Sequence, residues 1–446
     1  MVVSTLTMDA SVKSYLKGWY FKDNILIRKE HFGTLIMLSN GFRYKVPNHY
    51  FDLLEAIQKN DTVLESKYLS HIERKKIISF LQSLSKKRII EKTKRNPKNV
   101  RIVNNKFITK DCLSFPRTIY WECTNRCNFE CIHCYSFPRS SGENTNLPFK
   151  FIIKLINEMG EKGAEFLSMG GGEPLLYPHL LRVIKYSTER GLTCEISTNG
   201  SLIDKEKIKR LKKAGLKFIQ VSLDGACEKT YSKIRKGGNF KLVLKNISNL
   251  IKENFTVSIS MVMNNLNYRE VGDLIELSKN IGAKFFRIIP MMDIGRAQNI
   301  RYLQLKKEIL RSLFKYLSER KEKEREIFIQ FNHNLVTPDR KNISWMPENH
   351  YGCSAGRSTC GIDSYGNVYP CSYMFSQELN CGNIREKSLL EIWKNSSVMK
   401  RIRNITKLEG KCSKCRFLKF CRGGCRASVF IKTGKLNGSD PLCSIV

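Results

Sequence analysis

The chain has 446 residues, of which 41% are hydrophobic and 26% are charged, a composition that suits roughly two to four globular domains. No segment approaches the roughly 18 uninterrupted apolar residues of a membrane helix, and the N-terminus lacks the charged start, apolar run and cleavage site of a signal peptide. These features argue against a membrane span and predict a cytoplasmic protein.

The formal net charge of +36 at pH 7 is spread along the chain. It suits either an acidic partner, which would be nucleic acid or an acidic peptide, or simply a lysine-rich genome, and we favour the second interpretation. The chain also carries no RNA-binding signature. Nucleic acid is therefore not expected as a partner. The 16 cysteines, in a long chain without an export signal, indicate metal binding or catalysis instead of a disulfide scaffold.

Residues 1–95 are predicted to form a separate small domain. The pattern gives two strand-like stretches with an Asn–Gly turn in the second, then three helices and a short closing strand: Tyr20–Arg28, Thr34–Val46, Asn48–Gln58, Glu65–His71, Glu73–Ser85 and Arg88–Glu91. This order is similar to the winged-helix-like domain that recognises leader sequences of ribosomally made peptides. A generic winged helix that binds DNA is the alternative. Residues 96–115 are predicted to be a basic linker.

Residues 116–300 alternate short β-branched runs with amphipathic stretches, which is typical of βα units and a parallel sheet. The six predicted strands are Arg117–Glu122, Glu165–Met169, Thr193–Ser197, Phe218–Ser222, Thr256–Met261 and Lys284–Ile289.

After the first of these strands, Cys127, Cys131 and Cys134 form a CxxxCxxC motif. Three thiolates can hold three irons of a [4Fe–4S] cluster and leave the fourth iron open for a small molecule. The motif resembles that of the radical S-adenosylmethionine (SAM) superfamily, in which the open iron binds SAM and an electron from the cluster cleaves it to a deoxyadenosyl radical. A zinc site is the alternative, but zinc sites more often use paired CxxC units.

The resemblance extends to polar motifs after the next three strands, each of which alone would fit a turn or a helix N-cap equally well. In the family, the GGEP stretch holds the SAM amino group, and polar positions after the third and fourth strands contact the ribose and the carboxylate. An aromatic between the cluster cysteines commonly lies near the adenine; His133 occupies this position, where filling space is its alternative role. The implied SAM-binding residues are Gly171, Gly172, Glu173, Pro174, Ser197, Asn199, Ser222, Asp224, His133, Arg235 and Arg296.

Residues 301–349 are predicted to be a charged helical connector, and residues 350–446 a cysteine-rich extension. The order C…Gx4C…CxxCx5CxxxC…C resembles the SPASM extension, which carries two auxiliary iron–sulfur clusters. By family wiring, the first cluster is implied to use Cys353, Cys360, Cys371 and Cys425, although Cys360 lies one residue farther from Cys353 than expected. The second is implied to use Cys412, Cys415, Cys421 and Cys443. The five remaining cysteines are expected to be buried apolar residues.

The predicted fold class is therefore α/β: a partial (βα)6 radical SAM barrel between a winged-helix-like domain and a SPASM extension. The domain order is similar to that of thioether and carbon–carbon cross-linking peptide maturases. It implies SAM, one catalytic and two auxiliary [4Fe–4S] clusters, a precursor peptide, and an electron donor such as flavodoxin or ferredoxin. No catalytic acid or base is identified from the sequence.

Three alternatives stay open. Anaerobic sulfatase maturases resemble this chain, but in them an aspartate follows the cysteine of the Gx4C unit, whereas Ser372 follows Cys371 here. Modification of a small molecule in haem or quinone-cofactor synthesis would make residues 1–95 dispensable. An iron–sulfur regulator that binds nucleic acid would show salt-sensitive DNA binding and no SAM cleavage.

Overall fold

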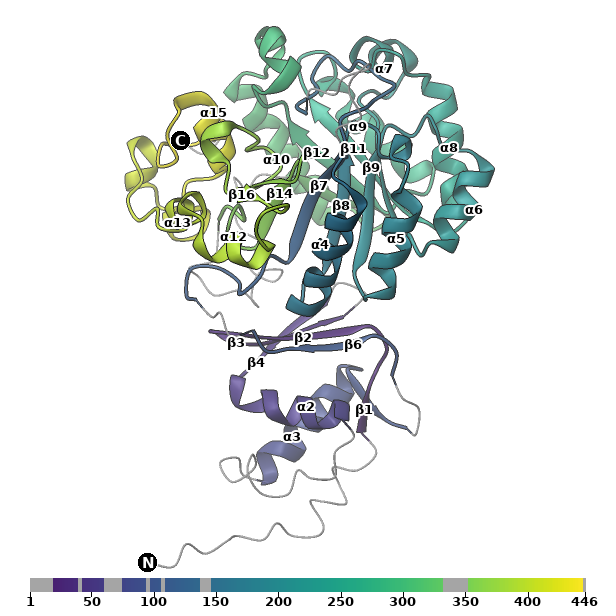
Figure 1. Ribbon diagram of the computed structural model, residues 1–446. Coiled ribbons are helices and arrows are strands. Elements are labelled where there is room, and N and C mark those ends of the chain that lie inside the picture. The colour runs from purple at the N-terminus through teal and green to yellow at the C-terminus, as the bar shows by residue number, and fades with distance from the viewer. Residues whose placement is uncertain are drawn as a thin grey trace, which may run out of the picture.

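The computed structural model describes residues 19–38, 42–59, 74–93, 97–105, 109–136, 146–331 and 352–443. A small N-terminal unit lies below a larger α/β unit, and the C-terminal extension lies beside the first barrel strand (Figure 1). The two units have separate hydrophobic cores. Within the described residues, no helix is both long and apolar enough to cross a membrane.

The N-terminal unit is built on a four-stranded sheet with the order β4–β3–β2–β6. Its strands are β2 (Ile25–Glu30), β3 (Gly33–Leu38), β4 (Arg43–Val46) and β6 (Val100–Val103); the pair β1 (Trp19–Phe21) and β5 (Ile90–Lys92) and the helices α2 (Phe51–Lys59) and α3 (Arg74–Lys86) complete the unit. The first and third predicted helices are present, as are strands in each predicted strand region. The stretch Tyr20–Arg28, predicted as one strand, is divided between β1 and β2, which belong to different sheets. The predicted turn at Asn40–Gly41 and the helix over Glu65–His71 lie outside the described residues, and the winged-helix assignment stays a prediction.

The helix predicted over Asn48–Gln58 begins at Phe51, so Asn48 lies before its first turn. Asn48 begins a 3₁₀ turn, η1 (Asn48–Tyr50), that precedes α2. Its amide nitrogen donates to Glu30 O at 2.7 Å, and its amide oxygen accepts from Thr34 Oγ1 at 3.0 Å. The side chain is therefore used to join the turn to the sheet.

Strand β6 falls within the stretch predicted to be a linker. It pairs in parallel with β2, from Ile25 opposite Val100 to Arg28 opposite Val103. The run Val–Arg–Ile–Val is apolar enough for a strand, but its lysine- and asparagine-rich flanks hide it in the sequence. The chain thus returns to the N-terminal sheet before it enters the barrel.

The barrel contains all six predicted strands, in sequence order and parallel: β7 (Thr118–Thr124), β8 (Phe166–Gly171), β9 (Thr193–Thr198), β10 (Phe218–Ser222), β11 (Thr256–Met263) and β12 (Phe285–Pro290). At one edge, β13 (Phe328–Phe331) adds a further parallel strand. At the other, β14 (Thr359–Ile362) pairs in parallel with β7 and continues antiparallel into β15 (Asn367–Tyr369) and β16 (Gly382–Asn383). The C-terminal extension therefore shares a sheet with the barrel.

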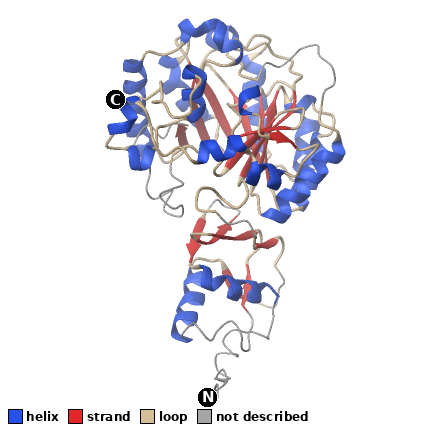
Figure 2. Cartoon of the chain, turned by 60° about the vertical axis from the view of Figure 1, so that its left-hand side comes forward, coloured by secondary structure: helices blue, strands red, loops and turns tan. Residues whose placement is uncertain are grey.

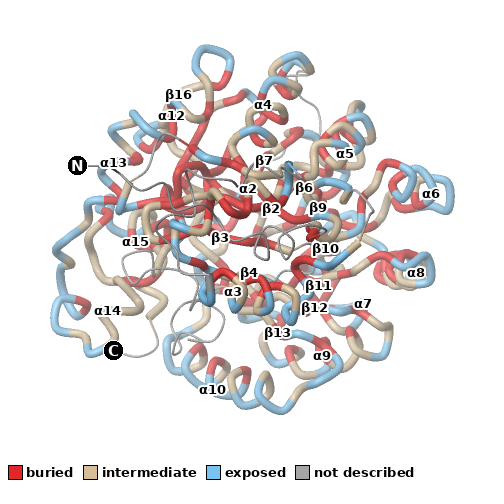
Figure 3. Tube along the Cα trace, turned by 90° about the horizontal axis from the view of Figure 1, so that it is seen from below, coloured by how far each residue is buried: buried red, intermediate tan, exposed pale blue. Residues whose placement is uncertain are grey.

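Helices cover the outer face of this sheet (Figure 2). They are α4 (Phe149–Lys162), α5 (Leu180–Glu189), α6 (Lys205–Lys213), α7 (Glu228–Ile234), α8 (Phe240–Lys252), α9 (Val271–Asn280) and α10 (Lys307–Lys323). In α8 the buried positions Phe240, Val243, Ile247 and Leu250 recur every three or four residues, which gives one apolar face. The view from below shows buried strands inside helices whose outer turns are exposed (Figure 3).

The N-terminal sheet contacts the amino ends of the barrel strands. Arg28 Nη1 donates to Gly163 O, just before β8, at 2.7 Å, and Arg43 pairs with Glu165 at 2.8 Å. Arg28 also forms a fully buried ion pair with Glu30, in which Nε lies 2.8 Å from Oε1. Glu30 in turn accepts from the backbone and hydroxyl of Ser114, so buried polar contacts connect the two units.

The C-terminal extension ends in short helices: α12 (Leu389–Asn395), α13 (Ser397–Arg403), α14 (Leu418–Cys421) and α15 (Arg426–Thr433). Trp393 of α12 is fully buried, and its indole nitrogen donates to Leu113 O at 2.9 Å. This contact fixes the extension against the segment that leads into β7. The predicted domain limits themselves stay a prediction.

Candidate active site

The candidate active site is a cavity of about 200 Å³ at the carboxyl ends of the barrel strands. Every strand from β7 to β12 contributes a lining residue, and Ser372 and Tyr373 enter from the loop after β15. Catalytic groups gather at this end of parallel barrels. Nine of the eleven predicted SAM-binding residues line the cavity, and the exceptions are Pro174 and Asp224. The structure therefore brings the motifs together, while their contact with SAM stays a prediction.

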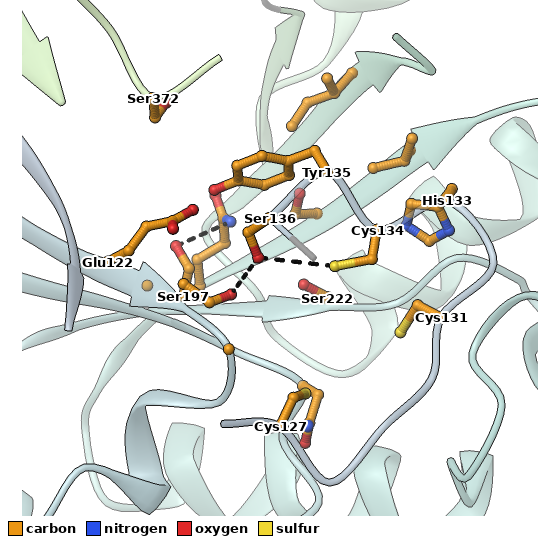
Figure 4. A pocket seen from close by; sticks show the side chains of 18 of the residues that line it. Glu122, Cys127, Cys131, His133, Cys134, Tyr135, Ser136, Ser197, Ser222 and Ser372 are labelled. Carbon is orange, nitrogen blue, oxygen red and sulfur yellow. Dashed lines mark hydrogen bonds between the residues drawn. The ribbon is translucent and has the colours of Figure 1, made fainter. Parts of the chain in front are cut away.

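The three cysteines of the first motif lie on one loop at the side of the cavity (Figure 4). Burial is the largest of the causes that raise the pKa of Cys127 to about 11, and the Glu173 carboxylate and the thiols of Cys131 and Cys134 act in the same direction. Such a group stays protonated unless a cation holds it as thiolate. The residues present therefore fit an iron–sulfur cluster with three protein ligands.

The segment that follows β12 holds this loop from the other side. Arg296 donates from its backbone nitrogen to Cys134 O at 2.8 Å and from Nε to Cys131 O at 2.8 Å. A Cβ on Gly295 would lie 2.2 Å from Cys134 O, and the φ of this residue is +63°. Only glycine permits this approach, so Gly295 and Arg296 together fix the position of the cluster loop.

The GGEP stretch crosses the start of the same loop. The nitrogen of Gly172 donates to Thr124 O and that of Glu173 to Arg126 O, each at 2.7 Å. A Cβ on Gly172 would lie 2.0 Å from Arg126 O. Ser136 Oγ, beyond the third cysteine, donates to Gly171 O at 3.0 Å. The glycines thus permit two backbone segments to pass in direct contact.

The carboxylate of Glu173 accepts hydrogen bonds from protein groups on both of its oxygens. Its Oε1 accepts from Thr198 Oγ1 at 2.7 Å and from Leu175 N at 3.1 Å, and its Oε2 accepts from Asn199 N at 2.8 Å. Burial raises its pKa, and these donors oppose the increase. Glu173 therefore joins the ends of β8 and β9, which places Asn199 at the cavity.

Asp224 lies behind the cavity wall. Its Oδ2 is 2.6 Å from Arg235 Nε and 3.4 Å from His133 Nε2, and its Oδ1 accepts from Val262 N at 2.6 Å. Arg235 Nη1 lies 3.6 Å from Cys131 Sγ. The side chain predicted to contact SAM is thus fully buried and instead holds the arginine and histidine that do line the cavity.

The C-terminal cysteines form two groups. Burial is the largest cause that raises the pKa of Cys371, and the neighbouring thiols of Cys353 and Cys425 add to the increase. Burial likewise raises the pKa of Cys421, and the thiols of Cys443 and Cys412 add to it. The first group holds three of the four cysteines predicted for the first auxiliary site, and the second holds three of the four predicted for the second, without Cys415. All of these ligand roles stay predictions. Within the described part of the chain, no three or more His, Cys, Asp or Glu side chains are placed to hold a single metal ion.

Cys360 lies apart from the first group. It is fully buried in the barrel core, whereas Cys353, Cys371 and Cys425 pack against a separate apolar cluster of the extension. A Cβ on the next residue, Gly361, would meet the backbone of Cys371 at 2.8 Å. Because neighbouring side chains of a strand point to opposite faces, the Cys360 thiol points away from Cys371. Burial raises the pKa of Cys360, and the thiol that adds to this increase is that of Cys381, which is not a member of the first group.

We therefore expect the Cys360→Ala variant to retain the iron content of the wild-type protein after anaerobic reconstitution. The Cys371→Ala variant should lose iron, because it removes a member of the three-thiol group. Iron and sulfide analysis together with electron paramagnetic resonance would measure both. Equal iron loss in the two variants would show that Cys360 is a ligand after all.

Of the five cysteines left over by the motifs, Cys112, Cys123 and Cys194 are buried as expected, and Cys381 is half-buried. Cys227 is exposed, contrary to the expectation. It precedes the first turn of α7, where the chain has left the barrel interior.

Sequence reasoning missed several residues that line the cavity: Tyr120, Glu122, Tyr135, Ser136, Gln220, Arg287 and Tyr373. The alternation in β7 could have indicated the first two, because Trp121 and Cys123 face the core and their neighbours must face the barrel interior. Tyr373 had no such signal, since its position depends on the pairing of β14 with β7.

Two family models match the chain. Residues 121–278 match the radical SAM superfamily, and residues 353–416 match an iron–sulfur cluster-binding domain, SPASM. Among curated relatives, the AdoMet-dependent heme synthase of Methanosarcina barkeri is 30% identical over 351 residues, which cover 74% of this chain and 96% of the relative. The mycofactocin maturase MftC of Mycobacterium tuberculosis is 30% identical over 336 residues, which cover 74% of this chain and 83% of the relative.

Among solved structures, Streptococcus suis SuiB bound to S-adenosylmethionine is 20% identical and matches with a TM-score of 0.75. The match covers 95% of this chain and 99% of SuiB. SuiB bound to its precursor peptide SuiA matches with a TM-score of 0.72 and 19% identity over the same shares of the two chains. At this identity the likeness shows the fold, and at this coverage it includes the N-terminal unit.

Proposed function

Because this chain belongs to the radical SAM superfamily and carries a SPASM iron–sulfur domain, we propose that it is a peptide maturase that forms a thioether or carbon–carbon cross-link in a ribosomally made precursor. Its cofactors are S-adenosylmethionine and iron–sulfur clusters. When bound, they supply a deoxyadenosyl radical that takes a hydrogen atom from the substrate. We further propose a cytoplasmic location and an external electron donor such as flavodoxin or ferredoxin.

The N-terminal unit carries the proposal. The haem synthase and the peptide maturase MftC both leave about a quarter of this chain unmatched, whereas SuiB, whose structure with a precursor peptide is known, matches 95% of it. A small-molecule enzyme has no evident use for an additional sheet with its own core.

This sheet offers an edge for a peptide. Strand β4 is last in the order β4–β3–β2–β6, so its outer side has no partner strand among the described residues. Beside it, Tyr50 and Phe80 stack with ring centroids 3.9 Å apart, and Lys87 lies 5.1 Å from the Tyr44 ring. Strand addition uses backbone hydrogen bonds at such an edge, with neighbouring side chains for selectivity. The basic side chains suit an acidic leader.

The edge and the cavity lie at opposite ends of the barrel. Arg43 of β4 contacts Glu165, before β8, whereas the cavity lies where the strands end. Seven residues of β7 span about 23 Å at ~3.3 Å per residue. A leader bound on β4 therefore requires about seven or more extended residues between its binding motif and the residue that is modified.

The test is an anaerobic reaction of the reconstituted full-length protein with S-adenosylmethionine, a strong reductant and the small peptide encoded beside its gene. We expect deoxyadenosine and a peptide that has lost two hydrogens, located by mass spectrometry. The same peptide with a scrambled leader is the control and should be modified poorly. Deoxyadenosine with unchanged peptide would contradict peptide maturation.

A second candidate is modification of a porphyrin, favoured by the 30% identity to the haem synthase over 96% of its length. A parallel reaction with an iron porphyrin distinguishes the two functions. Porphyrin turnover without peptide turnover would replace the first proposal by the second. Absence of deoxyadenosine from fully iron-loaded protein would contradict both.

A further inference from the structure

Glu122 is a carboxyl group that the site described above does not use. It lies on β7 between the core residues Trp121 and Cys123, so its side chain points into the cavity (Figure 4). Its Oε1 is buried and has no hydrogen-bond partner. Among described residues, no hydrogen bond or ion pair to Glu122 is formed. A buried, unpartnered carboxyl oxygen is costly, which indicates that the group serves something that enters the cavity.

The other candidate proton acceptors of the cavity are committed or unsuited. Among the described residues that line the cavity, Glu173 is the only other carboxylate, and both of its oxygens accept hydrogen bonds from the protein. His133 lies inside the cluster motif, and its Nε2 faces Asp224 Oδ2 at 3.4 Å. Burial raises the pKa of Tyr373 to about 12, so this phenol stays protonated near neutral pH. Glu122 is left as the available base among the described lining residues.

The surroundings of Glu122 favour proton uptake. Burial, with Asp363 in the turn between β14 and β15, raises its pKa well above the usual value. Burial raises the pKa of the Tyr135 phenol in the cluster loop and of the Tyr369 phenol in β15, and the nearby Glu122 carboxyl adds to the increase in both. A general base is most effective when its pKa approaches the working pH. The carboxylate is thus placed between the cluster loop and the hairpin of the extension.

We propose that Glu122 receives the proton that the peptide releases when the new bond forms. This inference rests on the proposed cross-linking function. Cross-linking removes two hydrogens: one leaves a peptide carbon as a hydrogen atom and ends in deoxyadenosine. The resulting carbon radical then bonds to a thiol sulfur or second carbon of the peptide. That step releases one electron, which an iron–sulfur cluster accepts, and one proton, which the Glu122 carboxylate takes.

The experiment uses the reconstituted full-length protein and the neighbouring-gene peptide labelled with deuterium at its carbon-bound positions. In Glu122→Gln, deuterium should still pass into deoxyadenosine at close to the wild-type rate, because this step precedes proton release. Cross-linked peptide should fall by at least about 10²-fold, as expected for loss of a general base. Glu122→Asp should restore part of the product. The rise of the wild-type product rate with pH should be absent in Glu122→Gln.

Glu195→Gln is the matched control. Glu195 is also a barrel carboxyl whose pKa burial raises, but it does not line the cavity. This variant should retain both label transfer and product. Thermal unfolding of each variant verifies that it is folded, and Glu122→Asp provides the test if Glu122→Gln does not fold.

Two results would overturn the inference. Product formation by Glu122→Gln at the wild-type rate would show that another group takes the proton. Equal loss of label transfer and product would show that Glu122 positions the peptide instead. Failure of the proposed function is seen separately, because the wild-type protein would then leave the same peptide unmodified.

Discussion

Replacement of Gly172 by alanine is expected to abolish S-adenosylmethionine cleavage. The added Cβ would lie 2.0 Å from Arg126 O and 2.6 Å from its carbonyl carbon, both of which are backbone atoms directly before Cys127. The loop must therefore move, and the hydrogen bonds from Gly172 to Thr124 and from Glu173 to Arg126 are lost. A displacement of about 1 Å in a catalytic group can reduce the rate by about 10²-fold. Deoxyadenosine formation should fall by at least that factor.

Gly272→Ala is the control for this variant. Gly272 lies in α9, where an added Cβ would meet only the hydroxyl of Tyr316, at 3.2 Å. Alanine is the better helix former, so this variant should cleave S-adenosylmethionine normally. Liquid chromatography of deoxyadenosine, normalised to iron content, measures both. Normal turnover by Gly172→Ala would show that the loop accommodates the methyl group and that the crossing is not critical.

Replacement of Arg28 by methionine is expected to destabilise the protein by about 3–5 kcal/mol, because it leaves the Glu30 carboxylate buried without its cation. The variant also loses the donor to Gly163 O, which connects the N-terminal sheet to the barrel. Urea denaturation measures the change in the free energy of unfolding, provided that the variant and the wild-type protein show the same dependence of this free energy on urea concentration.

Two comparisons identify the cause. Lys22→Met removes an ion pair that is 41% and 48% exposed, so it should change stability by less than about 1 kcal/mol. The double variant Arg28→Met with Glu30→Gln keeps an acceptor for Ser114 but removes the charge, and it should recover part of the lost stability. If Arg28→Met destabilised the protein as little as Lys22→Met, the contacts of the buried pair with Gly163 and Ser114 would not stabilise the packing of the two units.

The sequence was sufficient for the features that are encoded locally. The barrel strands follow from β-branched runs, and the structure confirms all six. The cluster loop, the GGEP stretch and the polar residues after β9 and β10 follow from spacing along the chain. Parallel strands then place these motifs at one end without any knowledge of side-chain contacts.

Features that depend on pairing between distant segments could not be predicted. Strand β6 is a short apolar run that becomes a strand because it pairs with β2, whose residues lie about 75 positions earlier in the chain. The orientation of Cys360 follows from the pairing of β14 with β7, and spacing alone suggested a ligand. The burial of Asp224 required the position of Arg235, which motif comparison treats as an independent site.

The pairing of β6 with β2 has a practical meaning for anyone who divides this protein into pieces. A cut after residue 95, at the predicted domain limit, would leave β6 on the catalytic fragment and expose the backbone of β2 on the excised one. Unpaired strand edges promote aggregation. A cut beyond β6 would instead remove Arg101, which donates to Gly160 O and Ala164 O of the barrel. Strand β6 therefore connects the N-terminal unit to the barrel. Loss of turnover after truncation could result from damage to this connection as readily as from loss of leader recognition.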